Sequence, residues 1–284
     1  MVESRLTRYL LRVAVALTLA FIYVPLLVIG LYAFNESVTL GWPIESFSTK
    51  WFSVAYENEG VRDALKLSVL AGLGATLIAL VLGTLASLAV SRYRFFGREV
   101  VTFAVILPIA LPGIITGLAL QATIIDVFGP LGLSFGLATI VIGHATFCVV
   151  VVYNNALARL RRTAGSLDEA SADLGADSWQ TFRFVTFPQM RTALLAGALL
   201  AFALSFDEVV VTIFTAGAEQ TLPIWIFASL FRPAEQPIVN VVALFVIIAS
   251  IVPIYFAQRL AGGTGLTSER PVKGTVAASV DAEP

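Results

Sequence analysis

Six stretches of this 284-residue chain carry no charge, or almost none, and each is long enough to cross a lipid bilayer. A transmembrane helix needs about 20 mostly apolar residues. The stretches cover residues 13–35, 67–91, 100–125, 127–158, 192–216 and 238–258. Mean hydropathy is +0.88 and only 13% of the residues are charged, whereas a soluble domain carries about 25%. The chain is therefore predicted to be an all-α integral membrane protein with six transmembrane helices.

The basic residues predict how these helices are oriented. Cytoplasmic segments of membrane proteins carry an excess of Lys and Arg. With the N-terminus inside, the outer segments hold only four of the 18 basic residues: Lys50, Arg62, Lys66 and Arg232. Both termini are therefore expected in the cytoplasm. A short tail (1–12) precedes the transmembrane domain (13–260), and a tail rich in small and polar residues (261–284) is expected to be disordered.

The longest polar insert, residues 159–191, separates the fourth and fifth stretches and predicts two short helices. Ser166 as the N-terminal cap, with Glu169 three residues later, is typical of a helix start. Gly175 is the expected end of that helix, because glycine readily adopts the left-handed conformation of a C-terminal cap. A second helix is expected from residue 178 until Pro188 closes it. By itself, such an insert is either a solvated connection or a docking element for a cytoplasmic protein.

Two carboxylates, Asp207 and Glu208, interrupt the fifth stretch. An ionised carboxylate at membrane depth is costly and is usually functional. A cationic substrate would favour the charged form of either group, so both are candidates for a substrate path. A position near the outer interface, or bonding to another helix, is the alternative.

His144, in the fourth stretch, is the only histidine. It is expected to be a hydrogen-bonded packing residue or a polar lining of the same path, with Ser205 and Thr212 as weaker candidates. The chain has no cluster of His and Cys that would predict a metal site.

One pattern in the insert resembles the signature of permease subunits of bacterial ABC importers. That signature is Glu-Ala-Ala, three residues, Gly, nine residues, then Ile, any residue, Leu-Pro. The matching residues here are Glu169-Ala170-Ser171, then Gly175, then Val185-Thr186-Phe187-Pro188. The chain departs from the signature at Ser171, Val185 and Phe187 and keeps its spacing. Segments 91–95, 143–147 and 206–211 are also similar to spermidine/putrescine permeases, most of all to the second permease subunit, within a likeness that covers roughly residues 10–260.

The resemblance implies a multi-pass protein of the bacterial inner membrane that imports a polyamine, or a related small organic cation, by alternating access. It implies two copies of an ATP-binding subunit, a second related permease and a periplasmic substrate-binding protein as partners. The matched positions Glu169, Ala170, Ser171, Gly175 and Pro188 are then the candidates for coupling to the ATPase.

The chain is not expected to be an enzyme. The glycine-rich segment 262–268 lacks the Lys of a phosphate-binding loop, so ATP is expected on partner subunits and no cofactor is expected here. Neither catalytic residues nor a nucleic-acid partner is predicted. An ion-coupled secondary transporter that works without an ATPase, with Asp207 and Glu208 as its coupling site, is the alternative function.

Overall fold

The computed structural model describes residues 5–163 and 165–262. Within these residues the regular structure is helical, apart from one isolated bridge between Asn35 and Phe47. Six helices are long and apolar enough to cross a membrane: Arg5–Tyr32, Glu59–Arg92, Gly113–Leu131, Leu137–Arg162, Ser178–Phe206 and Pro233–Ile251. The prediction of an all-α protein with six spans is confirmed.

The α-helices, in chain order, are α1 (Arg5–Tyr32), α2 (Lys50–Glu57), α3 (Glu59–Arg92), α4 (Arg98–Ala110), α5 (Gly113–Thr123), α6 (Leu137–Arg162), α7 (Ser166–Asp173), α8 (Ser178–Thr181), α9 (Phe187–Phe206), α10 (Val210–Thr215), α11 (Leu222–Ser229) and α12 (Gln236–Gly262). Short π and 3-10 turns join them: η1 (Ile124–Phe128), η2 (Gly129–Leu131), η3 (Phe182–Thr186) and η4 (Pro233–Glu235).

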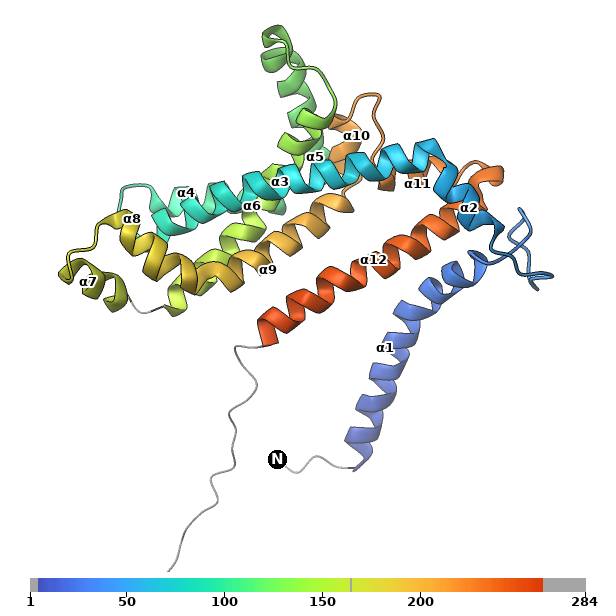
Figure 1. Ribbon diagram of the computed structural model, residues 1–284, viewed down its shortest axis with the longest axis horizontal. Coiled ribbons are helices and arrows are strands. Elements are labelled where there is room, and N and C mark those ends of the chain that lie inside the picture. Colours follow the sequence, from blue (N-terminus) through green and yellow to red (C-terminus); the bar gives the residue numbers. More distant parts are fainter. Residues whose placement is uncertain (1–4, 164, 263–284) are drawn as a thin grey trace, which may run out of the picture.

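The centre of the molecule is a bundle of α3, α6 and α9, which all pack on one another (Figure 1). Small residues let the backbones approach closely, as in many membrane bundles. A Cβ added to Gly83 of α3 would lie 3.0 Å from the backbone nitrogen of Tyr153 and 3.0 Å from the carbonyl oxygen of Val149, both on α6. The helix α12 packs on α9, and α1 contacts α12 without burying any of its own residues.

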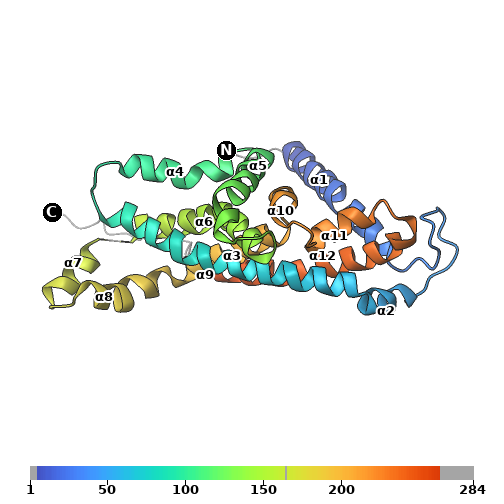
Figure 2. The same ribbon diagram turned by 90° about the horizontal axis from the view of Figure 1, so that it is seen from above.

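The two ends of the bundle differ in structure. In both views, α7 and α8 extend from one end, whereas α2 and α11 cover the opposite end (Figures 1 and 2). The polar insert therefore lies at the end of the bundle opposite to α2.

The third apolar stretch is not one straight helix. It breaks after Ala110, where Leu111 takes an extended conformation (φ −83°, ψ 145°) before Pro112. A residue that precedes proline avoids the helical conformation, since the proline ring crowds it. The second half, α5, stands away from the bundle (Figure 1) and packs on α10.

Two expectations for the insert are wrong in detail. Pro188 does not close a helix, because α8, η3 and α9 form one continuous span, Ser178–Phe206. Pro188 lies in the first turn of α9, directly after the π turn η3, and a widened turn accommodates a residue that has no N–H. Ser166 is the first residue of α7 rather than its cap, which is Gly165 and offers no side chain.

The close contact at Gly83 makes a stability prediction. Gly83→Ala should lower the stability of the detergent-solubilised protein by about 1–3 kcal/mol, because the methyl group meets backbone that cannot swing aside. Gly30→Ala in α1 is the matched control, since its added Cβ lies 3.6 Å from the nearest side chain. Thermal denaturation followed by size-exclusion chromatography measures both. Equal melting temperatures for the two variants would contradict the close packing of α3 on α6.

Candidate functional site: the break in the fifth span

The fifth span breaks between α9 and α10. The N–H of Asp207 still donates to Ala203 O at 3.2 Å, and α10 begins three residues later at Val210. The Glu208 carboxylate accepts the N–H of Val211 at 2.9 Å, and its own carbonyl accepts the Thr212 hydroxyl at 2.7 Å. Glu208 therefore caps the start of α10, where a negative charge near the helix N-terminus is favourable.

His144 on α6 joins the two sides of this break. Its Nδ1 lies 2.7 Å from Ser205 Oγ at the end of α9, and its Nε2 lies 2.8 Å from Thr212 Oγ1 on α10. Since the Thr212 hydroxyl donates to the Glu208 carbonyl, it accepts from the imidazole, which places the proton of a neutral ring on Nε2. Nδ1 then accepts from Ser205. His144 is only 1% exposed. It therefore lies in the core and connects α9 to α10 across the break.

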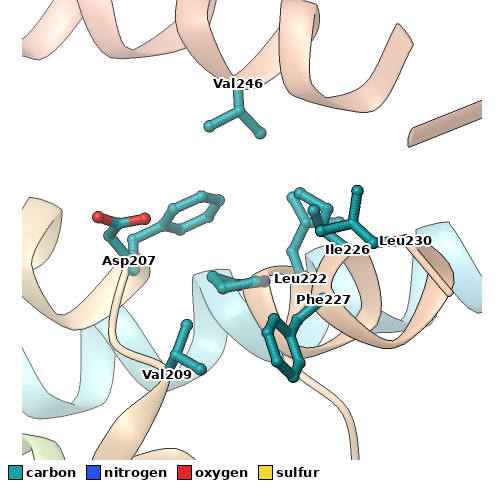
Figure 3. A pocket seen from close by; sticks show the side chains of 9 residues that line it. Asp207, Val209, Leu222, Ile226, Phe227, Leu230 and Val246 are labelled. Atoms are coloured by element: carbon teal, nitrogen blue, oxygen red, sulfur yellow. The ribbon is translucent and has the colours of Figure 1, made fainter. Parts of the chain in front are cut away.

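The carboxylate of Asp207 takes no part in the hydrogen bonds around His144 and Glu208. Its side chain is exposed, and among the described residues no hydrogen bond or ion pair reaches its carboxylate. It lies at the edge of a cavity of about 250 Å³ (Figure 3). The rest of the lining is apolar: Phe206, Val209, Leu222, Pro223, Ile226, Phe227, Leu230 and Val246. A single carboxylate at the edge of an apolar cavity suits a ligand that combines a cationic group with a hydrocarbon chain.

The polar insert is built on a Schellman motif that ends α7. Gly175 has φ +84°, its N–H donates to Ala172 O at 2.9 Å, and the N–H of Ala176 donates to Ser171 O at 3.0 Å. A residue with a Cβ would be strained in this left-handed conformation. The Ser171 hydroxyl also lies 2.7 Å from that of Thr181, which fastens α7 to α8.

The outward surface of α7 is both acidic and apolar. Glu169 and Ala170 are exposed, and Leu167 and Leu174 are 47% and 89% exposed. The other described residues thus leave both leucines uncovered. Pro188, the last position of the signature, is also exposed but lies on α9, away from this surface.

Sequence reasoning missed two features of these sites. The apolar lining of the cavity comes from α9, α11 and α12, and no local spacing connects those segments. The contacts of Asp168 with Arg92 and Thr186 were missed for the same reason.

Known proteins with similar sequences support this architecture. Residues 75–263 match the family model of the binding-protein-dependent transport system inner membrane component. The chain is 33% identical over 243 residues to the putrescine transport system permease protein PotI of Escherichia coli K12, which covers 83% of this chain and 84% of that protein. It is 30% identical over 258 residues to the spermidine/putrescine transport system permease protein PotC of Haemophilus influenzae, covering 90% and 98%.

Solved structures share the fold at low sequence identity. A chain of a bacterial ABC transporter involved in the import of alginate superposes with a TM-score of 0.65 at 18% identity, over 93% of this chain and 99% of that one. A chain of the MetNI methionine ABC transporter in an inward-facing conformation gives a TM-score of 0.58 at 17% identity, over 76% and 99%. The chain therefore belongs to the inner membrane components of binding-protein-dependent transport systems, the permease subunits of bacterial ABC importers.

Proposed function

We propose that this chain is the permease subunit through which an ATP-driven importer moves a polyamine, or a related small organic cation, across the inner membrane by alternating access. The observation that carries the substrate class is the unpaired Asp207 carboxylate beside an apolar cavity at the break of the fifth span. The names of the putrescine and spermidine/putrescine permeases that it resembles support the same class.

The chemistry of the cavity suits such a substrate. An ammonium group beside Asp207 replaces the water that the carboxylate loses, and opposite charges attract more strongly in a membrane interior than in water. The apolar lining contacts the methylene chain between two ammonium groups. Glu208 contributes negative potential without being free to move, since it caps α10. Further carboxylates for a second ammonium group would come from the paired permease.

The partners follow from the two ends of the bundle. The excess of basic residues supports a cytoplasmic position for the end that bears α7 and for both termini. The exposed surface of α7 around Glu169 then docks on an ATP-binding subunit, two copies of which bind and hydrolyse ATP. The α2 and α11 end faces the periplasmic substrate-binding protein. A second related permease covers α1, which the rest of this chain leaves unburied. The chain itself carries no catalytic residues.

Docking of α7 on the ATPase is tested by charge reversal. Glu169→Lys should reduce the amount of ATP-binding subunit that co-purifies with the chain by about tenfold, because reversing a charge at an interface costs about 1.4 kcal/mol, which is a factor of ten in affinity. Glu99→Lys is the control, as an exposed acidic residue at the start of α4. If wild type retains no ATPase and still imports substrate without ATP, the ion-coupled alternative replaces the proposed function.

The role of Asp207 is tested by neutralising it. Asp207→Asn keeps the shape of the side chain and removes the charge, so uptake of radiolabelled putrescine into proteoliposomes should fall by about 10–100-fold. Co-purification of the ATPase should be unchanged. Asp126→Asn in η1 is the matched control, since this carboxylate is also exposed and lies outside the cavity. Equal uptake by the Asp207 variant and wild type would remove Asp207 from the substrate path.

A further inference from the structure

One carboxylate in the insert, that of Asp168, contacts two separate membrane helices. Asp168 Oδ2 lies 2.7 Å from Arg92 Nη2 at the C-terminus of α3. Asp168 Oδ1 accepts the hydroxyl of Thr186 at 3.3 Å, in the last position of η3 before α9 begins. Its backbone carbonyl accepts the Ser171 hydroxyl at 2.9 Å. Asp168 is thus a junction between α7, the end of α3 and the start of α9.

The ion pair suits both helix ends that it joins. Arg92 is the last residue of α3, where a positive charge is favourable, and Asp168 lies in the first turn of α7, where a negative charge is favourable. The side chains are only 23% and 24% exposed. Arg92 Nε and Nη2 are both buried and form no hydrogen bond among the described residues. The 2.7 Å approach of Nη2 to Asp168 Oδ2 is therefore a charge contact, and Asp168 is the group that compensates the guanidinium there. Partial burial shields the pair from the solvent screening that weakens surface ion pairs.

Both helices that meet at Asp168 lead to the cavity. The helix α9 (Phe187–Phe206) is flanked by Thr186 at its start and by Asp207 at its end. The helix α3 carries Ser68 near its other end, where the Ser68 hydroxyl accepts the N–H of Leu222, a residue of the cavity wall. By contrast, the principal neighbours of α7 itself are α8 and η3. Within the described residues, the ion pair is a direct link from α7 to α3.

We propose that Arg92 and Asp168 form a coupling strut, which transmits displacement of α7 to α3 and so to the wall of the substrate cavity. Arg92 and Asp168 act as positioning residues, and neither contacts the transported molecule or ATP. When the ATPase moves α7, the strut makes the end of α3 follow, so that α3 and α9 shift together. Without it, α7 moves while α3 lags, and ATP is hydrolysed with little transport.

This inference rests on the proposed function, and its test separates the two. The purified complex, with the ATP-binding subunits that co-purify with it, is reconstituted into proteoliposomes. Uptake of radiolabelled putrescine and release of phosphate from ATP are measured on the same preparation. The variants are Arg92→Asp, Asp168→Arg and the charge swap Arg92→Asp/Asp168→Arg. Arg94→Asp is the control, because Arg94 lies in the same segment, is exposed and forms no ion pair within the described residues.

If the strut couples α7 to α3, single charge reversals should uncouple transport from ATP hydrolysis, and the double variant should restore part of the coupling. Each single reversal should lower the number of molecules imported per ATP by about tenfold, as expected for residues in direct contact, while the bound ATPase stays near the wild-type amount. The charge swap should recover part of that ratio, because it restores the ion pair but places each charge at the less favourable helix end. A swap no better than the single variants, or an Arg92→Asp ratio equal to that of Arg94→Asp, would overturn the strut while ATP-driven uptake by wild type still stands. Wild-type uptake that needs no ATP would overturn the proposed function first, and the strut with it.

Discussion

Inside a lipid bilayer every backbone N–H and C=O must find a partner within the protein, because the hydrocarbon offers none. This chain meets that requirement with helices, and the break in its fifth span is where the requirement becomes most demanding. There the Glu208 carboxylate accepts the backbone N–H of Val211. The Thr212 hydroxyl donates to the Glu208 carbonyl and accepts from the imidazole of His144. This small network fixes α9 and α10 relative to each other at the edge of the cavity.

The same constraint explains why two adjacent acids have different roles. Glu208 is used by the backbone that follows it, since its carboxylate caps α10. Asp207 directly follows α9, and its backbone N–H still donates to the carbonyl of Ala203. Its side chain is therefore not needed to satisfy the backbone. A carboxylate that the fold does not need is available to a ligand. The pattern of two acids in an apolar stretch predicts a costly site, whereas the division of roles depends on where the helix ends.

Local patterns predicted the parts of the structure that local interactions determine. Apolar length located the six spans, and the glycine at position 175 located the end of α7, because its left-handed conformation is a property of that residue alone. The continuity of the helix through Pro188 was not predictable in this way. A proline in the first turn of a helix and a proline that ends one have the same sequence appearance, and only the π turn η3 distinguishes them.

Contacts between distant segments could not be predicted from the sequence for a different reason. His144 meets partners 61 and 68 residues away, and its choice between lining a path and packing in the core depends on how α6, α9 and α10 meet. Spacing along one helix shows which residues share a face. It does not show which of the other helices that face will contact. Neither the hydrogen bonds of His144 nor the ion pair of Asp168 with Arg92 could therefore be predicted from the sequence.

The insert and the cavity are at opposite ends of the same continuous span. Ser178–Phe206 comprises 29 residues, which at 1.5 Å per residue is about 43 Å of helix with Asp207 directly after it. A helix transmits displacement along its axis well, but one helix alone can also pivot. The second connection, through α3 from Arg92 to Ser68 and Leu222, constrains that pivot, because two helices fixed at both ends must move as one body. An importer that couples ATP use at one end to a change of access at the other needs such a body between them.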